Sequence, residues 1–543
     1  MKRPTPMPKT QKILSAGILL IILYSLAINL PFLWEREFQG EAARRAVAAL
    51  EMMERGDYLI PYIEGRPYLL KPPGYNWVLI GFFKAFGSHS EFVARLSSVT
   101  AATLCALFLA LLFRAVAQPP GLIWVLPGLV FLSIPEVLDK ACRAEIDMTY
   151  TLLVTLSVFS WFYLHEIRKR PYLAWTVTLA FSALGTLTKT FQAPAFLYAA
   201  VGPYLLFKRR FREIFSPAHL LGLIIYAGIF SLWFIPAARR VGAERILSAW
   251  LGEYAGRQKP LSPSGFWGHF LTFPLEYFEG HLPWILFLPG WLPRNLREDL
   301  PFPVKDLALY SLCLLAFSFP LYWILPGTRL RYLLPAVGGL VYLLSVPLYR
   351  GWERDRLPGV SLLALRLLGG LILIALPLFV YISWGRLHLR GNLWALVGFL
   401  VVTSSGLLVF FGRRARLLVP ALFFFVWALK WTFAAVYFPY QERFRNHYSQ
   451  AARKLALHLP PGTLLCDYRL DTPHLTYYLK YKYRRIRHMR LTKDVQSLKG
   501  CKYIITTPEN LKDIPFKFKV LFKTKARKTT VILLETHETP GLQ

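Results

Sequence analysis

Apolar runs long enough to cross a lipid bilayer recur along most of this chain of 543 residues. The first lies between Lys12 and Glu35, where no residue carries a charge. A transmembrane helix needs about 20 mostly apolar residues, and on this criterion we expect about thirteen spans before residue 440. Hydrophobic residues make up 55% of the chain, which is too many for a set of soluble domains. The sequence therefore predicts an α-helical polytopic membrane protein.

The first apolar run has the position of a secretory signal peptide, which would be cleaved. It is longer than a signal core, and its end, "NLPFLWERE", lacks the small residues that a signal peptidase needs. We therefore expect an uncleaved first helix, with the basic N-terminus held in the cytoplasm.

Basic residues gather in alternate connections between the apolar runs, as in "RKR" at 168–170, "KRRFR" at 208–212 and "RRAR" at 413–416. This is the positive-inside pattern of a protein in the bacterial inner membrane. With an odd number of spans and a cytoplasmic N-terminus, the connections 35–91 and 239–281 and everything after residue 439 lie on the outer face.

Charge and cysteine content exclude other classes of partner. The net charge is +33, from 64 basic and 31 acidic residues, which would suggest nucleic acid in a soluble protein. Because many of the basic residues lie in short connections between apolar runs, membrane lipids are the expected partner and nucleic acid is not. The five cysteines show no CxxC or Cys/His spacing, so we predict neither a metal site nor a cofactor.

The last hundred residues change character and predict a second domain. We divide the chain into a transmembrane domain at 1–440, which includes the outer loop 35–91 with its surface helices, and a small α/β domain at 441–543. Charged residues are dense in the tail, and short β-rich runs such as "GTLLCDY", "CKYIITT" and "TTVILLE" recur. Cys466 and Cys501 lie in two apolar runs of this domain, where either a disulfide or two buried free thiols is expected.

The first outer loop holds an unusual set of polar residues. Its sequence favours a helix from Glu41 to Arg55 that stops at Gly56, and Glu41, Arg44 and Arg45 share one side of it. Lys71 follows in a segment that two prolines make rigid. A bland alternative is an amphipathic helix on the membrane surface followed by an aromatic belt.

This loop also carries the pattern of an acid followed three residues later by arginine and then "GDY..P...G..Y..KPP..W". The pattern resembles the first outer loop of the GT-C membrane glycosyltransferases that include the aminoarabinose transferases of lipid A and the protein O-mannosyltransferases. Three further stretches are similar to the same family: "AEIDMTYTLL" at 144–153, "LGTLTKTFQAPAFL" at 184–197 and "GTRLRYLLPA" at 327–336.

The resemblance implies a GT-C fold and a polyprenyl-phosphate sugar as the donor. Such a reaction needs a carboxylate to deprotonate or orient the acceptor and cations to stabilise the departing phosphate. We expect catalytic roles for Glu41 and Asp147. The residues expected to bind the donor phosphate are all basic: Lys71, Arg44, Arg45, Lys189, Arg329 and Arg331.

Each assignment has an alternative. The aminoarabinose transferases commonly carry Asp-Glu at the start of this helix, where this chain has Gly40-Glu41-Ala42. Counting back from Gly56 aligns Glu41 with the family's aspartate, and Glu35 and Glu37 are alternatives for the base. Asp147 is alternatively a structural carboxylate paired with Arg143 or Lys140. Lys189, Arg329 and Arg331 would then anchor helix ends at the interface.

The predicted function is transfer of a sugar, with inversion, to an acceptor lipid, glycan or protein on the outer face. Lipid A modification and protein mannosylation are both compatible with the sequence, which names neither sugar nor acceptor. The alternative from another class is a transporter or flippase for lipids or polysaccharides. A transporter typically has charged or broken helices at mid-membrane in two related halves, whereas the unusual charges here lie at predicted outer ends.

Overall fold

The computed structural model describes residues 9–34, 36–257, 263–292, 300–385, 393–444 and 447–536. The chain forms two compact units. The first, which we call the helical unit, comprises Met1–Phe32, Ser98–Cys142 and Ile146–Val436; the second, the mixed unit, comprises Leu33–Ser97, Arg143–Glu145 and Tyr437–Gln543. The mixed unit thus combines the first loop with the tail. The domain boundary at residue 440 stays a prediction, because compact units are defined by contacts and not by independent folding.

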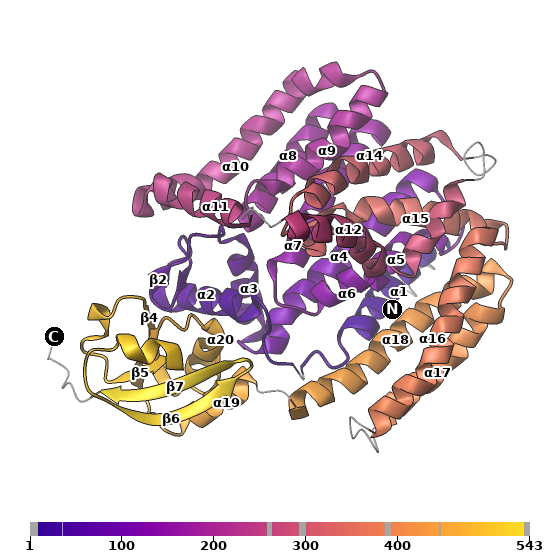
Figure 1. Cartoon of the computed structure of the whole chain (residues 1–543). Coiled ribbons are helices and arrows are strands. Elements are labelled where there is room, and N and C mark those ends of the chain that lie inside the picture. The colour runs from indigo at the N-terminus through magenta and orange to yellow at the C-terminus, as the bar shows by residue number, and fades with distance from the viewer. Residues whose placement is uncertain are drawn as a thin grey trace, which may run out of the picture. The chain divides into compact units, whose positions relative to one another are not determined.

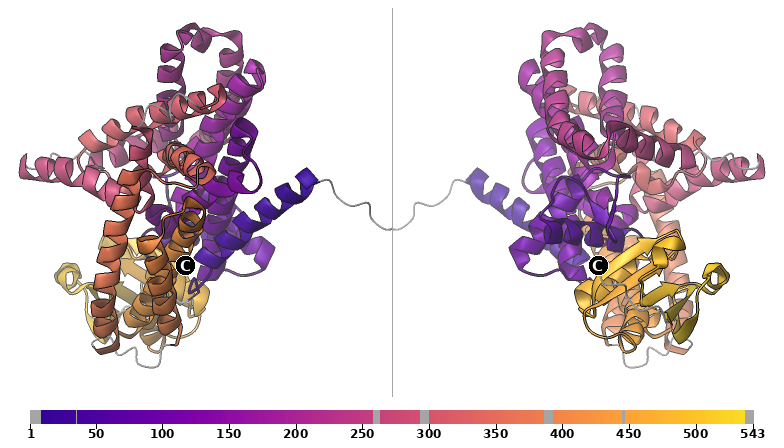
Figure 2. Two further views of the ribbon diagram at one scale, coloured as in Figure 1. Left: turned by 90° about the vertical axis from the view of Figure 1, so that its right-hand side faces the viewer. Right: turned by 90° about the vertical axis from the view of Figure 1, so that its left-hand side faces the viewer.

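Seven helices within the described ranges are long and apolar enough to cross a membrane, so this is a multi-pass membrane protein. They are α1 (Lys9–Asn29), α4 (Glu91–Ala117), α10 (Pro217–Val241), α14 (Phe302–Ile324), α16 (Gly359–Gly385), α17 (Leu393–Phe411) and α18 (Ala415–Phe444). Helices α16, α17 and α18 pack side by side (Figures 1 and 2), and Thr432 of α18 contacts the backbone at Gly398 of α17.

The other apolar runs form shorter elements. α7 (Ile146–Trp161) has 16 residues, about 24 Å at the helical rise, and continues in a π-helical turn, η2 (Phe162–Ile167). The run at 121–137 breaks before Pro135, and within the run at 282–293 the residues Trp284–Trp291 form a 3₁₀ segment, so the count of about thirteen spans stays a prediction. The remaining elements of this unit are η1 (Ile123–Val125), α5 (Leu126–Ser133), α6 (Pro135–Ala141), α8 (Pro171–Lys189), α9 (Gln192–Phe207), η3 (Phe211–Phe215), α11 (Ala243–Arg257), α12 (Pro263–Gly280), η4 (Trp284–Trp291), η5 (Leu330–Tyr332), η6 (Leu334–Ala336) and α15 (Val337–Glu353).

Buried aromatic side chains hold α7 against α14 and α15. Trp161 stacks on Tyr310 with ring centroids 5.7 Å apart, and Phe159 meets Tyr342 edge to face at 5.0 Å. The two tyrosine hydroxyls donate hydrogen bonds to backbone carbonyls, Tyr310 to Val158 at 2.7 Å and Tyr342 to the neighbouring α4 at 2.9 Å. Because each buried hydroxyl is satisfied, these rings add apolar contact without a polar penalty.

The first loop folds as predicted into a helix, α2 (Ala42–Arg55), which ends at Gly56 in the left-handed conformation. It is followed by the hairpin β1 (Tyr62–Ile63) and β2 (Arg66–Pro67) and by α3 (Gly74–Phe86). Within the mixed unit α2 packs against α3, β1 and the short tail helix α20 (Pro473–Thr476). It is therefore packed on several sides, unlike the amphipathic surface helix that the sequence suggests, and Arg45 of its expected polar face is buried.

The tail forms a five-stranded sheet in the order β4-β3-β5-β7-β6 (Figure 1). β3 pairs in parallel with β4 and β5, and β7 pairs antiparallel with β5 and β6. The three β-rich runs quoted above become strands, which confirms a small β-sheet region at the C-terminal end. The elements are α19 (Tyr448–Ala456), β3 (Thr463–Tyr468), η7 (Tyr477–Lys482), β4 (Ile486–Thr492), η8 (Gln496–Leu498), β5 (Tyr503–Thr506), η9 (Pro508–Asp513), β6 (Phe518–Ala526) and β7 (Thr529–Thr536).

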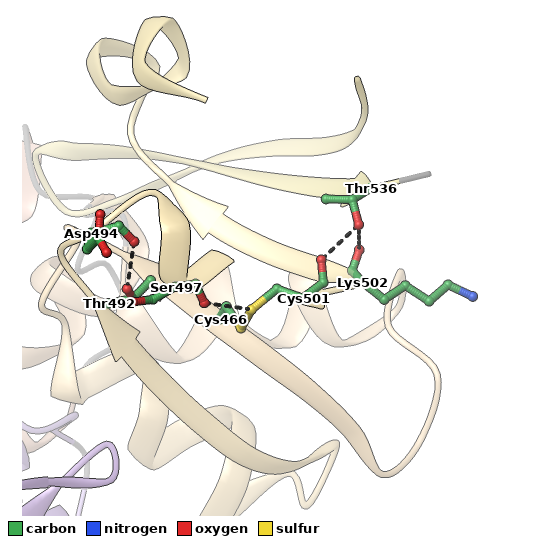
Figure 3. The surroundings of a disulfide bond; sticks show 7 residues. All are labelled: Cys466, Thr492, Asp494, Ser497, Cys501, Lys502 and Thr536. Carbon is green, nitrogen blue, oxygen red and sulfur yellow. Dashed lines mark hydrogen bonds between the residues drawn. A yellow bond between two sulfur atoms is a disulfide. The ribbon is translucent and has the colours of Figure 1, made fainter. Parts of the chain in front are cut away.

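A disulfide closes the core of this sheet. Cys466 on β3 is joined to Cys501, just before β5, with α-carbons 6.1 Å apart, and both are buried against Ile504 and Leu534. Thr536 of β7 donates a hydrogen bond to the Cys501 carbonyl at 2.8 Å (Figure 3). Of the two alternatives for these cysteines, the structure has the disulfide.

Within the mixed unit, a buried glutamate joins the first loop to the tail. Glu64 occupies the two-residue turn between β1 and β2, with φ of 54°. Its carboxyl accepts a hydrogen bond from the Thr476 hydroxyl, and its backbone carbonyl accepts one from the N–H of Leu491 on β4 at 3.3 Å. Burial raises the pKa of Glu64 well above its ordinary value, and the nearby Asp467 adds to the effect. Burial likewise raises the pKa of Asp467 to about 7.

Because the pKa values of Glu64 and Asp467 are raised, we expect the mixed unit to lose stability as pH rises. A carboxyl with a raised pKa binds its proton more tightly in the folded state, so folding is favoured below pH 4 to 5 and weakens as pH approaches about 7. We expect slower hydrogen exchange of the β3 and β4 amides at pH 5 than at pH 8, after correction for intrinsic exchange. Glu64→Gln should flatten this dependence, whereas Glu509→Gln, at an exposed position, should not. An unchanged slope in Glu64→Gln would contradict the prediction.

Candidate active site

Glu41 stands directly before α2, and its carboxylate faces two arginines of the first helical turn. Arg44 Nε lies 3.3 Å from Glu41 Oε2, and Arg45 Nη2 lies 3.9 Å from the same oxygen. The Glu41 side chain is 45% exposed, whereas that of Arg45 is 6% exposed. The i+3 and i+4 spacing thus places three of the predicted residues together, as expected. The carboxylate is the accessible member of the group.

Glu145 supports the start of the same helix, and the sequence analysis did not single it out. Its Oε1 accepts a hydrogen bond from the Glu41 backbone N–H at 3.4 Å. A Cβ at residue 40 would lie 2.6 Å from this oxygen, and Gly40 has φ of +58°, so glycine is required there twice over. Glu145 lies two residues before Asp147 in the stretch "AEIDM", and this proximity was the available signal.

Glu37, an alternative for the base, is occupied by partners in the tail. Its Oε1 lies 3.2 Å from His447 Nδ1 and 3.3 Å from Arg527 Nε, and its Oε2 accepts the Ser449 backbone N–H at 3.1 Å. Burial opposes ionisation, but these hydrogen bonds and charges hold the pKa of Glu37 below its ordinary value. Glu37 thus acts as a structural ion linking three segments of the mixed unit. Glu35, the other alternative, lies outside the described residues.

Lys71 lies between β2 and α3 and is 7% exposed. Pro72 and Pro73 follow it and restrict its backbone. In the same loop, the Arg45 guanidinium lies over the ring of Tyr68, 5.3 Å from its centroid. A buried lysine in a rigid segment is suited to hold a phosphate, because little side-chain freedom remains to be lost on binding.

The helical unit contains a second group of predicted residues around Asp147, the second residue of α7. Lys189, at the end of α8, places Nζ 2.7 Å from Asp147 Oδ1, and Arg331 of η5 places Nη1 4.0 Å from Oδ2. The Asp147 and Lys189 side chains are each 7% exposed. Arg329 is exposed and takes no part in these contacts. The structure thus brings Asp147, Lys189 and Arg331 together, which their spacing in the sequence alone could not have predicted.

Two tyrosine rings complete the surroundings of Lys189. Its Nζ lies 5.1 Å from the ring centroid of Tyr150 and 5.2 Å from that of Tyr332. A lysine between two aromatic faces and a carboxylate is held in position by these contacts. Lys140, one of the two residues expected as a structural partner of Asp147, has its Nζ 2.9 Å from Asp139 Oδ2.

Comparisons with known proteins bear on this arrangement. Residues 70–235 match the family described as dolichyl-phosphate-mannose-protein mannosyltransferase. The chain is 26% identical over 382 residues to the undecaprenyl phosphate-alpha-4-amino-4-deoxy-L-arabinose arabinosyl transferase of Erwinia tasmaniensis. The aligned residues make up 68% of this chain and 66% of that relative. A transferase of the same description from Pseudomonas savastanoi pv. phaseolicola is 29% identical, over 40% of each chain.

The fold is that of a solved relative. The crystal structure of ArnT from Cupriavidus metallidurans bound to undecaprenyl phosphate superposes with a TM-score of 0.72, at 18% identity, over 97% of this chain and 100% of that one. The chain is thus similar to a mannosyltransferase family over residues 70–235, to an aminoarabinose transferase over 68% of its length, and to the solved ArnT structure in its fold.

Proposed function

We propose that this chain transfers a sugar, with inversion, from a polyprenyl-phosphate donor of the undecaprenyl type to an acceptor lipid, glycan or protein at the outer face of the bacterial inner membrane. One observation carries the proposal: the segment 70–235 that matches the mannosyltransferase family contains Lys71, Asp147 and Lys189. Two of the relatives are named as transferases of a sugar carried on undecaprenyl phosphate, the same class of donor.

The proposed roles follow from the contacts of each residue. Glu41 accepts the proton of the acceptor hydroxyl, because it is the exposed carboxylate of its group. Asp147 orients the sugar or the acceptor and fixes Lys189. The basic residues bind the donor phosphate: Lys71, Arg44, Arg45, Lys189, Arg329 and Arg331.

The reaction is a single displacement at the anomeric carbon. The acceptor oxygen forms the new bond to this carbon while its proton passes to Glu41, and the bond from the carbon to the phosphate oxygen breaks. The departing polyprenyl phosphate gains negative charge, which the lysines and arginines stabilise. The proposal assigns no step to a metal or a cofactor.

A transporter is the alternative that the sequence leaves open. Two relatives that match 68% and 72% of this chain are named as arabinosyl transferases. The family matched by residues 70–235 is a mannosyltransferase family. These similarities support transfer over transport. Mass spectrometry of envelope lipids, glycans and proteins from cells with and without the gene tests the proposal: one class should lack a single sugar in the deletion strain, and three unchanged classes would contradict it.

The finer topology is also a proposal. We infer about thirteen spans, an N-terminus in the cytoplasm, and the first loop and the tail on the outer face, from the alternation of basic connections. The exposed connections after α7, α9 and α17 would then face the cytoplasm.

Cysteine labelling tests this topology. In a Cys142→Ser background, we expect Arg66→Cys and Lys519→Cys to react with an impermeant thiol reagent in intact spheroplasts. Arg212→Cys should react only after the membrane is opened. All three positions are exposed, so the side of the membrane decides accessibility. Reaction of Arg212→Cys in intact spheroplasts would overturn the orientation.

A further inference from the structure

An apolar pocket of about 660 Å³ lies within the helical unit, among α1, the segment 120–129 and α18. Its walls carry Leu20 and Tyr24 of α1, Leu122 and Leu126, and on α18 a stripe of residues that share one helical face: Val419, Pro420, Phe423, Phe424 and Trp427. The volume falls in the range of ligand sites. The proposed chemistry does not use this pocket.

The pocket opens on surface-exposed apolar side chains. Leu122 is 42% exposed and Phe424 is 62% exposed, although both line the cavity. In a helix that crosses a membrane, such residues face lipid. An occupant can therefore enter from the bilayer without passing through water.

One end of the pocket adjoins a cluster of arginines. Trp352 lines the cavity, and its backbone carbonyl accepts a hydrogen bond from Arg416 Nε at 3.3 Å. Arg416 also lies one helical turn before Val419 and Pro420, on the pocket face of α18. The polar end of the pocket thus lies where α15 meets the loop that follows it and where α18 meets the loop that precedes it.

These two loops are fastened together. The Arg416 backbone N–H donates to Asp355 Oδ1 at 2.9 Å, and the Ala415 N–H donates to the Asp355 carbonyl at 3.4 Å. We define the arginine cluster as the six arginines that they bring together: Arg350, Arg354, Arg356, Arg413, Arg414 and Arg416.

The cluster has a strong excess of positive charge. Residues 350–356 and 413–416 carry six arginines and two acids. Both acids are engaged inside the cluster, Glu353 by Arg350 at 3.0 Å and Asp355 by the backbone at 2.9 Å. Counting these two acids, the two segments carry a net charge of +4. A surface of this kind favours an anion at the membrane boundary.

We propose that this pocket and the arginine cluster form a binding site for an anionic phospholipid of the inner leaflet. The acyl chains occupy the apolar cavity and the headgroup phosphate meets the arginines, which form charge-assisted hydrogen bonds with phosphate oxygens. In the proposed topology this end faces the cytoplasm, opposite the face where sugar transfer takes place. The site would fix α18 and the connection after α4 to the surrounding leaflet.

Native mass spectrometry of the delipidated full-length protein in detergent tests the site, with phosphatidylglycerol and phosphatidylcholine as the probes. We expect wild-type protein to bind phosphatidylglycerol more tightly by at least about tenfold, because each basic residue near an anionic lipid strengthens binding about fivefold. The triple variant Arg413→Gln, Arg414→Gln and Arg416→Gln should lose this preference. A matched triple variant of exposed arginines elsewhere, Arg170→Gln, Arg209→Gln and Arg212→Gln, should keep it.

A second pair of variants tests the cavity without altering charge. Leu20→Trp fills the pocket and should weaken binding of both lipids, whereas Leu19→Trp, at an exposed neighbour that does not line the cavity, should bind as wild type. Equal binding of the two lipids by wild type, or equal binding by both tryptophan variants, would overturn the proposal. Displacement of bound phospholipid by stoichiometric polyprenyl phosphate would assign the pocket to the donor instead. None of these readouts depends on sugar transfer.

Discussion

Replacing Glu41 by glutamine is expected to lower sugar transfer by about 10²–10⁴-fold, the usual contribution of a positioned general base. The amide keeps the shape and the exposure of the side chain but cannot accept the proton of the acceptor hydroxyl. Arg44 and Arg45 lose an ionic partner that is 45% exposed, and exposed pairs contribute little to stability. The variant should therefore fold, insert into the membrane and bind the donor.

The control is a matched substitution on the same helix. Glu54 is exposed and its carboxylate lies 2.6 Å from Lys480, so Glu54→Gln removes an ion pair of the same unit but no predicted site residue. Transfer by Glu54→Gln should stay near the wild-type rate. Wild-type turnover in Glu41→Gln would remove Glu41 from the mechanism.

Lys71→Ala should lower sugar transfer by about 10²–10³-fold, because the charge on the departing phosphate loses a stabilising cation. Lys84→Ala, at an exposed position of α3, should not lower it.

Replacing Asp147 by asparagine is expected to destabilise the protein by about 3–5 kcal/mol and to abolish transfer. The cause is the buried ion pair: Lys189 Nζ lies 2.7 Å from Asp147 Oδ1, with both side chains 7% exposed. Loss of the carboxylate leaves the ammonium without its compensating charge. Thermal unfolding in detergent measures the stability, and transfer measured below the transition measures the activity.

A double variant separates the two roles of this pair. Asp147→Asn with Lys189→Met removes both charges, so most of the lost stability should return while transfer stays absent. The pair between Lys208 Nζ and Asp306 Oδ1, 2.5 Å apart at the end of α9 and in α14, is a matched control. Asp306→Asn should lower stability without a specific effect on transfer. Recovery of transfer in the double variant Asp147→Asn, Lys189→Met would show that Asp147 and Lys189 have a structural role only.

The sequence predicted the class of fold and the local structure of the first loop because both depend on short-range patterns. Apolar length marks membrane helices, and Gly56 at the end of an alanine-rich run marks the end of α2. The three β-rich runs of the tail likewise became strands. The disulfide between Cys466 and Cys501 could not be predicted with certainty from the sequence, because it depends on the pairing of β3 with β5. No local pattern contains the register of this pair.

The limits of prediction are clearest where partners are distant in sequence. Asp147 pairs with Lys189 and Arg331, which lie on other elements, whereas local reasoning suggested Arg143 or Lys140. The local sequence leaves Glu37 as an alternative for the base, because its partners His447 and Arg527 lie far along the chain in the tail and no local pattern indicates them. Burial of α2 was missed for the same reason, since α20 packs on it from the tail.

The central claim is that the donor is a sugar on a polyprenyl phosphate and that the sugar leaves the lipid. Purified full-length protein in detergent, given a radiolabelled polyprenyl-phosphate sugar and an envelope lipid extract, measures this directly by separating donor, free polyprenyl phosphate and labelled product. We predict that one polyprenyl phosphate is released for each sugar transferred. Release and transfer should both be lost in Glu41→Gln and kept in Glu54→Gln. An intact donor after incubation, together with movement of that donor across the membrane of protein-containing vesicles, would contradict it and identify a transporter.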